Sequence, residues 1–509
     1  MPETHPKNQD LKNRLGPIEM SPEEFREAGY RLVDRIAEFL AELPQKPVTP
    51  NPLPSEIREK IGTGSLPQHG VPAANLLDET ARLLFENSLF NGHPRFWGYI
   101  TSSAAPIGAL GDMLASAANP NVGAWSLSPV ASEIEAQTIR WIAEMIGYSP
   151  DCGGLLVSGG NMANFSGFLA GRKAKAGWDL RAAGMMGASR PLRVYVSAET
   201  HTWIQKAADL FGLGTDAICW IPVDDDLRMD VESLRKQIQA DVDEGLQPFM
   251  VVGTAGSVGT GAVDPLPRIA EICRENDLWF HVDGAYGAVA AALPEASADL
   301  KGLAEADSIA LDPHKWLYSP LEAGCVLVRN PQHLIDAFSF RPEYYNFDSV
   351  GDEEPLNYYE FGLQNSRGFR ALKVWLGLRQ VGRQGYLQMI RDDIALTKTL
   401  GELLDAQPEI QLLSQNLSIV TFRYRPNGLL TGIDSAEAYM NDLNRELLNR
   451  IQAGGEAYVS NALIQGKFAL RACIVNFRTT LADIEMLPEY VVKLGRKLDA
   501  EMRPEGGIR

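Results

Sequence analysis

An alternation in the middle of the chain limits the fold more than any other feature of the sequence. Short runs rich in β-branched and other apolar residues recur there, and stretches with helical periodicity separate them. The runs are Leu192 to Ser197, Ile218 to Ile221, Phe249 to Gly253, Trp279 to Asp283 and Ser308 to Leu311. The segments 231–242 and 266–276 between them have helical character. Strand, helix and strand in repeated order predict an α/β fold with a largely parallel sheet covered by helices.

The N-terminal region follows a different pattern. Ser21-Pro22-Glu23-Glu24 has the form of a capping box, which predicts the start of a helix. Apolar residues then recur at helical spacing and form one stripe: Phe25, Leu32, Val33, Ile36, Phe39 and Leu40. Seven prolines between Pro44 and Pro72 predict an extended segment that wraps across a neighbouring surface. A single arm would leave its stripe exposed to water, so we expect a second copy of the chain to cover it in a homodimer.

Length and pattern together divide the chain into three parts. A chain of 509 residues exceeds the usual size of one domain. Beyond Trp375 the pattern changes to long helices with fewer strands. We therefore predict an N-terminal helical arm with its extended segment over 1–95, a large α/β domain over 96–375 and a small C-terminal α+β domain over 376–509.

Composition excludes several classes of partner. The net charge of −18, from 47 Lys and Arg against 65 Asp and Glu, argues against broad electrostatic binding to nucleic acid or to an anionic membrane. The five cysteines are far apart and no histidine cluster completes a zinc site, so we expect reduced cysteines and no metal centre. The N-terminal stretch lacks an apolar signal core, and no apolar run approaches the roughly 20 residues of a membrane span. We expect a cytoplasmic protein whose partners are a small-molecule substrate and a second copy of itself.

Reactive side chains follow the ends of three predicted strands. Asp283 ends one run, Lys315 follows another within Asp312-Pro313-His314-Lys315-Trp316, and His201 follows a third. Ligands of parallel sheets bind at the carboxyl ends of the strands, so the three side chains are candidates for one site. Each has a plainer interpretation when taken alone: Asp283 can cap a turn, His201 can begin a helix, and Lys315 can lie on the surface.

The glycine-rich stretch Gly153 to Asn164 is a fourth feature, and we expect it to form a turn that enters a helix. It lacks the Gly-Lys-Ser/Thr ending of a P-loop and the spacing of a dinucleotide fold. Backbone N–H groups at the start of a helix can still hold a phosphate, and a plain tight turn is the alternative. Phosphate site, imidazole, carboxylate and lysine together match what pyridoxal phosphate requires.

The sequence resembles the group II pyridoxal-phosphate decarboxylases, which include aromatic-L-amino-acid, tyrosine, tryptophan, histidine and glutamate decarboxylases. The resemblance covers nearly the whole chain, and it is carried by His93-Pro94-Arg95-Phe96, Asn164, His201 and the stretches HVDGAYG, DPHKWL and LRACIVNFRTT. It implies a fold type I enzyme with a mainly parallel seven-stranded sheet covered by helices, an N-terminal helical arm and a small C-terminal α+β domain. It also implies a homodimer with sites at the interface.

The resemblance implies a role for each residue of the site. Lys315 forms the Schiff base with the cofactor, Asp283 pairs with the pyridinium nitrogen, and His201 stacks on the ring. Tyr344, in a stretch over 341–360 that resembles the mobile catalytic loop of the family, is the proton donor to the α-carbon. The other implied cofactor contacts are Ala285 on the opposite ring face, Gly160, Asn161 and Met162 in the phosphate loop, Asp312 and His314 near the phosphate and the lysine, and Ser257 near the ring hydroxyl. Asp312 stands where some members carry asparagine, and Ser257 where many carry threonine.

The predicted reaction is decarboxylation of an L-amino acid to an amine and carbon dioxide. Four residues match segments of the family's side-chain pocket and favour an aromatic, tyrosine- or tryptophan-like substrate: Trp97, Tyr99, Trp125 and Ser366. The alternatives are a decarboxylase of glutamate, aspartate or diaminobutyrate, an aldehyde synthase, and an aminotransferase in which Arg471 would bind the α-carboxylate. A non-catalytic binding protein that keeps the fold is the alternative outside enzymes.

Overall fold

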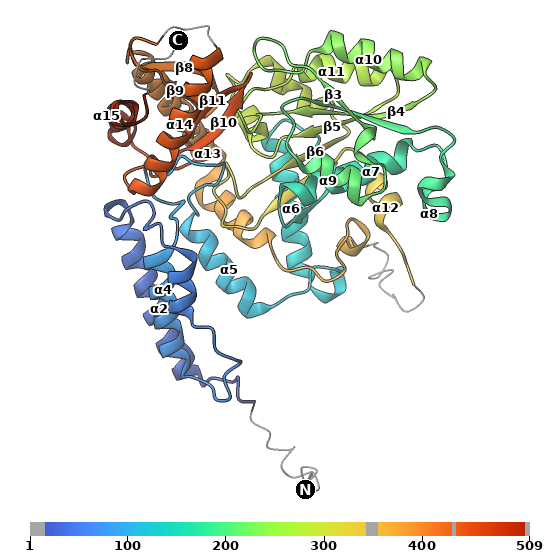
Figure 1. Ribbon diagram of the computed structural model, residues 1–509. Helices are drawn as coiled ribbons and strands as arrows, with labels where there is room; N and C mark the ends of the chain where they lie inside the picture. The colour runs from blue at the N-terminus through green and yellow to red at the C-terminus, as the bar shows by residue number, and fades with distance from the viewer. Residues whose placement is uncertain (1–15, 343–354, 430–433, 504–509) are drawn as a thin grey trace, which may run out of the picture. The chain divides into compact units, whose positions relative to one another are not determined.

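The computed structural model describes residues 16–342, 355–429 and 434–503 (Figure 1). The chain divides into two compact units, one that ends at Phe90 and one that begins at Asn91. In the part of the chain that the structure describes, no helix is both long and apolar enough to cross a membrane.

The first unit is helical. Its elements are α2 (Pro22–Glu42), the 3-10 turn η1 (Leu43–Gln45), α3 (Pro54–Ile61) and α4 (Ala73–Asn87). The predicted capping box is confirmed, because the Ser21 hydroxyl accepts a hydrogen bond from Glu24 N while Ser21 N donates to the Glu24 carboxylate. Helices α2 and α4 pack together, with the rings of Phe39 and Phe85 stacked at 4.3 Å.

The proline-rich segment is not extended throughout, so that prediction is wrong for α3. Pro54 stands in the first turn of this helix, where its missing N–H has no partner to lose. The carboxylate of Glu56 accepts a hydrogen bond from Leu53 N at 2.8 Å and so supports the helix start.

A seven-stranded sheet forms the core of the second unit. Its strands are β1 (Gly153–Val157), β2 (Leu192–Ser197), β3 (Ile218–Ile221), β4 (Gln247–Thr254), β5 (Trp279–Asp283), β6 (Ser308–Leu311) and β7 (Gly324–Val328). Their order is β1-β7-β6-β5-β4-β2-β3. All pairs from β3 to β6 are parallel, and β7 runs antiparallel to both of its neighbours. The prediction of a mainly parallel seven-stranded sheet in an α/β fold is confirmed.

Helices cover both faces of this sheet, as Figure 1 shows with α10 and α11 above it and α7 and α9 below. The helices and 3-10 turns of the region are α5 (Pro106–Ala118), η2 (Trp125–Leu127), α6 (Pro129–Met145), α7 (Gly160–Lys175), α8 (Leu180–Ala183), η3 (Gly184–Gly187), α9 (Trp203–Leu210), η4 (Thr215–Ala217), α10 (Val231–Asp243), α11 (Leu266–Glu275), η5 (Gly287–Ala292), η6 (Ala298–Glu305), α12 (Gln332–Phe338) and η7 (Tyr358–Glu360). One expectation is corrected here: the stretch 153–157 is the buried strand β1, not a turn, because its backbone pairs with β7. The turn is confined to Ser158 and Gly159, and α7 begins at Gly160.

The rest of the second unit is an α+β region. Helix α13 (Ala371–Asp405), which is interrupted at Gly382, leads to β8 (Ile410–Asn416), β9 (Ile419–Tyr424), α14 (Asp434–Gly454), β10 (Ser460–Ile464), β11 (Lys467–Cys473) and α15 (Leu481–Met502). The four strands form an antiparallel sheet in the order β10-β11-β9-β8. A hydrophobic core of its own lies beside this sheet and includes Phe422, Leu443 and Leu470.

Candidate active site

The carboxyl ends of the parallel strands open onto a cavity of about 490 Å³. This volume lies within the usual range for sites that bind small molecules. Ten of the residues predicted from the sequence line it: Tyr99, Gly160, Asn161, Met162, His201, Asp283, Ala285, Asp312, His314 and Lys315. The strand order places β5 beside β6, so the acidic end of one strand and the lysine turn of the next are neighbours.

Lys315 is held in a tight turn after β6. Its backbone N donates a hydrogen bond to Asp312 O at 2.9 Å, and its Nζ lies 3.1 Å from Asp312 Oδ2. Asp312 is almost completely buried, and its Oδ1 has no hydrogen-bond partner among the described residues. The turn therefore holds an ammonium group against a carboxylate that keeps one oxygen available to a donor.

His314 belongs to the same turn. Its Nδ1 accepts a hydrogen bond from Ala323 N at 3.0 Å, and its Nε2 lies 3.7 Å from Asp312 Oδ2. Burial lowers the pKa of His314, although the charge of Asp312 opposes the shift. The ring is therefore neutral near pH 7, and because Nδ1 accepts, its hydrogen lies on Nε2 and faces Asp312.

Asp283 is oriented by two donors. Trp203 Nε1 donates to Asp283 Oδ2 at 2.8 Å, and Ala285 N donates to Asp283 Oδ1 at 3.2 Å. Trp203 is fully buried and begins helix α9, so this helix links the end of β2 to the end of β5. Both carboxylate oxygens are fixed before any ligand arrives.

His201 lies between β2 and α9 and presents its ring to the cavity. Its Nδ1 accepts a hydrogen bond from Trp203 N at 3.3 Å. Desolvation in the cavity lowers the pKa of His201, and Lys315 adds to the shift while Asp283 opposes it. A neutral and flat ring of this kind can stack on an aromatic ligand.

The glycine turn after β1 closes another side of the cavity. Gly159 has φ 152° and ψ −178°, a backbone conformation in which side chains are rarely found. A Cβ on Gly160 would lie 2.7 Å from Asp312 Oδ2, so a side chain there would displace the carboxylate. The absence of both side chains leaves the N-terminal turn of α7, with its unpaired N–H groups, open to the cavity.

Ser257 and Trp97, two residues predicted for the site, lie outside the cavity. Other groups form their hydrogen bonds there. Ser257 is buried and shares a hydrogen bond of 2.8 Å with Thr260 Oγ1, while its neighbours Gly256 and Val258 line the cavity in its place. Trp97 is fully buried in the core beside the antiparallel sheet, where its Nε1 donates to Thr479 Oγ1 at 3.3 Å.

Trp125 and Ser366 also lie outside this cavity. Trp125 Nε1 donates to Glu133 Oε1 at 2.8 Å, and Ser366 is exposed. Tyr344, the predicted proton donor, lies outside the described residues. The described residues on either side of its segment are joined, since Arg341 Nε donates to Glu360 Oε1 at 2.6 Å.

Several residues of the cavity had no signal in the sequence. Thr254 ends β4, and its hydroxyl is buried without a partner among the described residues. Glu199 lines the cavity, and burial raises the pKa of its carboxyl. Trp203, which holds Asp283 from outside the cavity, had only its place shortly after His201 as a signal in the sequence.

Arg471 is the residue that would bind the substrate α-carboxylate if the protein were an aminotransferase. In the structure it is a buried cation in the cavity lining. Its Nε donates to Ser460 Oγ at 3.0 Å and its Nη1 donates to Val258 O. Burial lowers the pKa of Arg471 from its usual value. It comes from β11, and no local pattern connects that strand with the lysine turn.

This lining fits pyridoxal phosphate. Lys315 offers an amine, Asp283 an oriented carboxylate, and the start of α7 a glycine-walled place for a phosphate. The buried hydroxyl of Thr254, which has no partner among the described residues, can form a hydrogen bond with the ring hydroxyl of such a ligand. The residues present can therefore hold the cofactor that the sequence suggests.

Comparisons with known proteins agree with the geometry. Residues 54–425 match the family model of the pyridoxal-dependent decarboxylase conserved domain. An aromatic-L-amino-acid decarboxylase of Bacillus atrophaeus is 36% identical over 92% of this chain and 94% of its own length. A phenylacetaldehyde synthase of a Rosa hybrid cultivar is 30% identical over 89% of this chain and 90% of its own. The crystal structure of Oryza sativa TDC with PLP and tryptamine has a TM-score of 0.87 and 27% sequence identity, covering 95% of this chain and 100% of that chain.

Proposed function

The chain belongs to the pyridoxal-dependent decarboxylase family, and from this premise we propose that it converts an aromatic L-amino acid, tyrosine-like or tryptophan-like, into the amine and carbon dioxide. It is a pyridoxal-phosphate-dependent amino-acid decarboxylase, a lyase whose cofactor is pyridoxal 5'-phosphate. The observation that supports the aromatic substrate is the similarity, over nearly the full length of both chains, to an aromatic-L-amino-acid decarboxylase.

Two neighbouring strand ends hold the reactive part of the cofactor. The amine of Lys315, positioned by Asp312, would bind its aldehyde carbon. Asp283, oriented by Trp203 and Ala285, keeps a proton on its ring nitrogen. Once bound, pyridoxal phosphate supplies the electron sink that lets carbon dioxide leave the α-carbon.

The remaining lining residues position the ring and the phosphate. His201 and Ala285, which both line the cavity, would lie against the two faces of the ring. Backbone N–H groups at Gly160, Asn161 and Met162 hold the phosphate at the start of α7.

The ring hydroxyl takes a different partner from the one that the sequence suggested. Thr254 lines the cavity with a hydroxyl that is free of other described partners, so we assign this contact to Thr254 in place of Ser257. His314, whose Nε2 lies 3.7 Å from Asp312 Oδ2, stands beside this carboxylate.

Tyr344 is the proposed proton donor to the α-carbon, on the strength of the sequence resemblance. Its phenol gives a proton at the carbon from which carbon dioxide has left. Tyr99, half exposed in the cavity lining, is the proposed contact for the substrate ring.

Arg471 favours a second candidate, the decarboxylation of an amino acid with an acidic side chain. A buried guanidinium beside the cavity can pair with a second substrate carboxylate. Glutamate and aspartate therefore belong in any substrate test.

An aldehyde synthase is the third candidate, because a phenylacetaldehyde synthase is among the relatives. Such an enzyme oxidises the decarboxylated substrate with molecular oxygen and releases aldehyde, ammonia and hydrogen peroxide. This chain retains Tyr344, which supports the amine as product.

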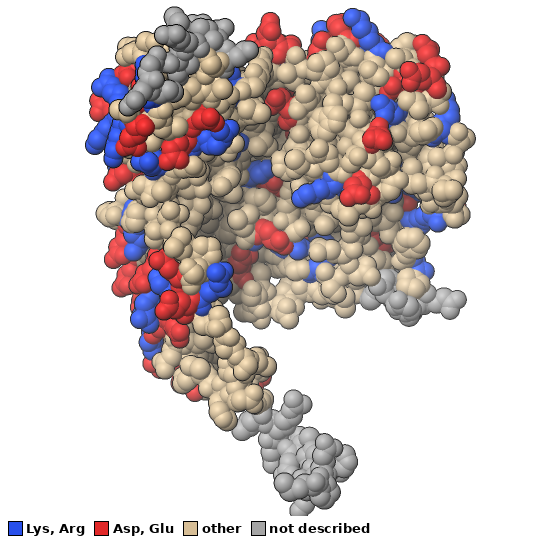
Figure 2. All heavy atoms as spheres, viewed as in Figure 1, with Lys and Arg blue, Asp and Glu red and all other residues tan. Residues whose placement is uncertain are grey.

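The proposed assembly is a homodimer. Large apolar side chains are exposed on α2 and α4 in the first unit and on α5 in the second: Phe25, Val33, Leu76, Leu84, Leu110, Met113 and Leu114. On the face of the larger unit seen in Figure 2, charged side chains gather along the upper rim, and others lie scattered between broader uncharged areas. Exposed apolar area of this extent is usual where another protein surface binds. Light scattering after size exclusion should give twice the mass of the chain.

We also place the protein in the cytoplasm. All five cysteines are free. Free cysteines in a chain without disulfides are typical of a reducing compartment.

A substrate panel tests the proposed reaction. The cofactor-loaded protein is incubated with tyrosine, tryptophan, phenylalanine, histidine, glutamate and aspartate, and carbon dioxide, amine and peroxide are measured together. Equal amounts of carbon dioxide and amine from an aromatic substrate support the proposal. Release from glutamate or aspartate alone would overturn the aromatic assignment, and peroxide in place of amine would indicate the aldehyde synthase.

A further inference from the structure

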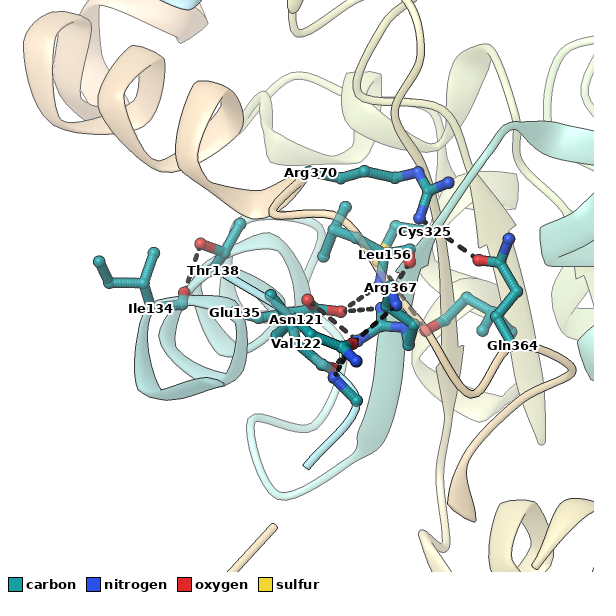
Figure 3. Close-up of polar contacts among 12 residues, drawn as sticks. Asn121, Val122, Ile134, Glu135, Thr138, Leu156, Cys325, Gln364, Arg367 and Arg370 are labelled. Carbon is teal, nitrogen blue, oxygen red and sulfur yellow. Dashed lines mark hydrogen bonds and ion pairs between the residues drawn. The ribbon is translucent and has the colours of Figure 1, made fainter. Parts of the chain in front are cut away.

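A buried ion pair lies outside the cavity and takes no part in the chemistry described above. The side chains of Arg367 and Glu135 are 1% and 0% exposed, and Arg367 Nη1 lies 3.3 Å from Glu135 Oε2 while Nη2 contacts Oε1 (Figure 3). Burying two charges costs free energy that their attraction often fails to recover, so such a pair is weak as a source of stability alone. Its contacts indicate a more specific role.

The pair satisfies the open edge of strand β1. Within the described part of the chain this strand pairs only with β7, where Leu156 lies opposite Cys325, so no described strand lies at its other edge. Leu156 N donates to Glu135 Oε1 at 2.8 Å, and Arg367 Nη2 donates to Leu156 O at 2.7 Å. Two side chains thus take the place of a missing strand at Leu156.

Arg367 also fixes a second segment to this edge. Its Nη1 donates to Val122 O at 3.0 Å, and Val122 N donates to Arg367 O at 2.8 Å. The side chain of Asn121 accepts a hydrogen bond from Arg367 N at 3.0 Å. Figure 3 shows these groups converging on the guanidinium from α6, from β1 and from the segment around Val122.

The strand held in this way leads directly into the glycine turn of the cavity. Ser158, Gly159 and Gly160 follow the end of β1 and all three line the cavity. The turn has little room on its far side, because a Cβ on Gly324 would lie 2.6 Å from the backbone of Gly159. A small shift of β1 must therefore move the turn, since close-packed interiors transmit displacements.

We propose that Glu135 and Arg367 are positioning residues that hold the end of β1 and thereby set the place of the phosphate-binding turn. The inference rests on the phosphate contact assigned to this turn in the proposed function. It does not depend on which amino acid is the substrate.

The test measures how strongly the apo-protein prefers a phosphorylated ligand. Pyridoxal phosphate and pyridoxal, which differ only in the phosphate, are titrated separately by absorbance against wild type, Glu135→Gln and Arg367→Lys. Both variants should lose about tenfold in affinity for pyridoxal phosphate and change little in affinity for pyridoxal, which is the scale of effect seen when residues that orient ligand-binding groups are changed. If one of these conservative variants folds poorly, the other still tests the proposal.

A second Arg–Glu pair, in which Arg423 is buried and Glu437 is 33% exposed, provides a control. Arg423 Nη1 donates to Glu437 Oε2 at 2.7 Å and Nη2 donates to Oε1 at 3.2 Å, but this pair lies beside the antiparallel sheet. Arg423→Lys should lower the melting temperature and leave the preference for phosphate unchanged.

Two outcomes would overturn the proposal. Equal losses of affinity for pyridoxal phosphate and for pyridoxal in the Glu135 and Arg367 variants would mean that the pair has only a structural role. A wild-type protein that binds both ligands equally would remove the phosphate contact from the turn itself. Neither result would bear on the decarboxylation, which the substrate panel tests separately.

Discussion

The ends of strands β5 and β6 each bring an aspartate to the cavity, yet the two carboxylates have different surroundings. Both oxygens of Asp283 accept hydrogen bonds, from Trp203 Nε1 and Ala285 N. Asp312 contacts the ammonium of Lys315 through one oxygen, and its other oxygen has no partner among the described residues. The carboxylate at the end of β5 is therefore already oriented without a ligand, whereas the proposed reaction of Lys315 would change the contacts at the end of β6. The two residues are of the same type, so their neighbouring groups account for the different roles proposed for Asp283 and Asp312.

The largest expected effect follows removal of the reactive group at the β6 end. Lys315→Ala should lower turnover by about ten-thousandfold or more, as expected when a covalent catalytic group is lost. The fold should survive, because one lysine contributes little to a core of this size. Turnover and the visible absorbance of the lysine-bound cofactor measure the effect. Normal absorbance and turnover in the variant would remove Lys315 from its assigned role.

Asp283→Asn tests the anchor at the β5 end. The variant should bind the cofactor and lose about a thousandfold in turnover, because an uncharged amide no longer holds the proton on the ring nitrogen. Cofactor content and turnover are measured on the same samples. A wild-type rate would mean that Asp283 only supports the turn.

Tyr344→Phe tests whether the proton that reaches the α-carbon comes from Tyr344 and not from a residue at either strand end. The variant should form amine about a hundredfold more slowly, as expected for loss of a proton donor. With molecular oxygen as the oxidant, aldehyde, ammonia and hydrogen peroxide should appear. Amine and peroxide are assayed together in wild type and variant. An unchanged amine yield without peroxide would show that Tyr344 is not the proton donor. His201, which lines the cavity, would then be the next candidate.

Asp312→Asn should have a smaller effect than the equivalent change at Asp283, about tenfold in turnover. The asparagine oxygen can still accept a hydrogen bond from the amine of Lys315, so only the charge is lost. Steady-state rates of the two asparagine variants give the comparison directly. Equal losses would mean that the two strand ends do not differ as their contacts indicate.

The smallest expected effect concerns stability near the β5 end. Burial lowers the pKa of His281 to about 4, so the folded protein holds this ring neutral at pH values where the unfolded chain protonates it. The free energy of unfolding should therefore decrease as pH falls from about 6.5 to 4, by about 3 kcal/mol from this group.

Denaturant titrations at several pH values, on wild type and His281→Gln, measure that contribution. The variant should be less stable at pH 7, because the ring bonds to Ser308 and Asn164 are lost, and should show a shallower dependence on pH. The same slope in both proteins would assign the pH dependence to other groups.

Local features of the sequence determined most of the scaffold. Strands β2, β3, β5 and β6 have the bounds that their apolar runs predict, and helix α2 begins at its capping box. Such runs and breaks act within a few residues, so they can be interpreted without knowledge of the rest of the chain. Ligands of parallel sheets bind at the carboxyl ends of the strands, and this rule predicted that Asp283, His201 and Lys315 lie at one edge of the sheet.

The tertiary structure alone decided the contacts between distant segments. Trp97 went into the core beside the antiparallel sheet, while Arg471 from that sheet entered the cavity. Glu135 and Arg367 meet across the open edge of β1 although they are far apart in the chain. Which side chains meet in this way depends on how whole elements pack and in what register. Periodicity shows that a face is buried but does not name the group that covers it.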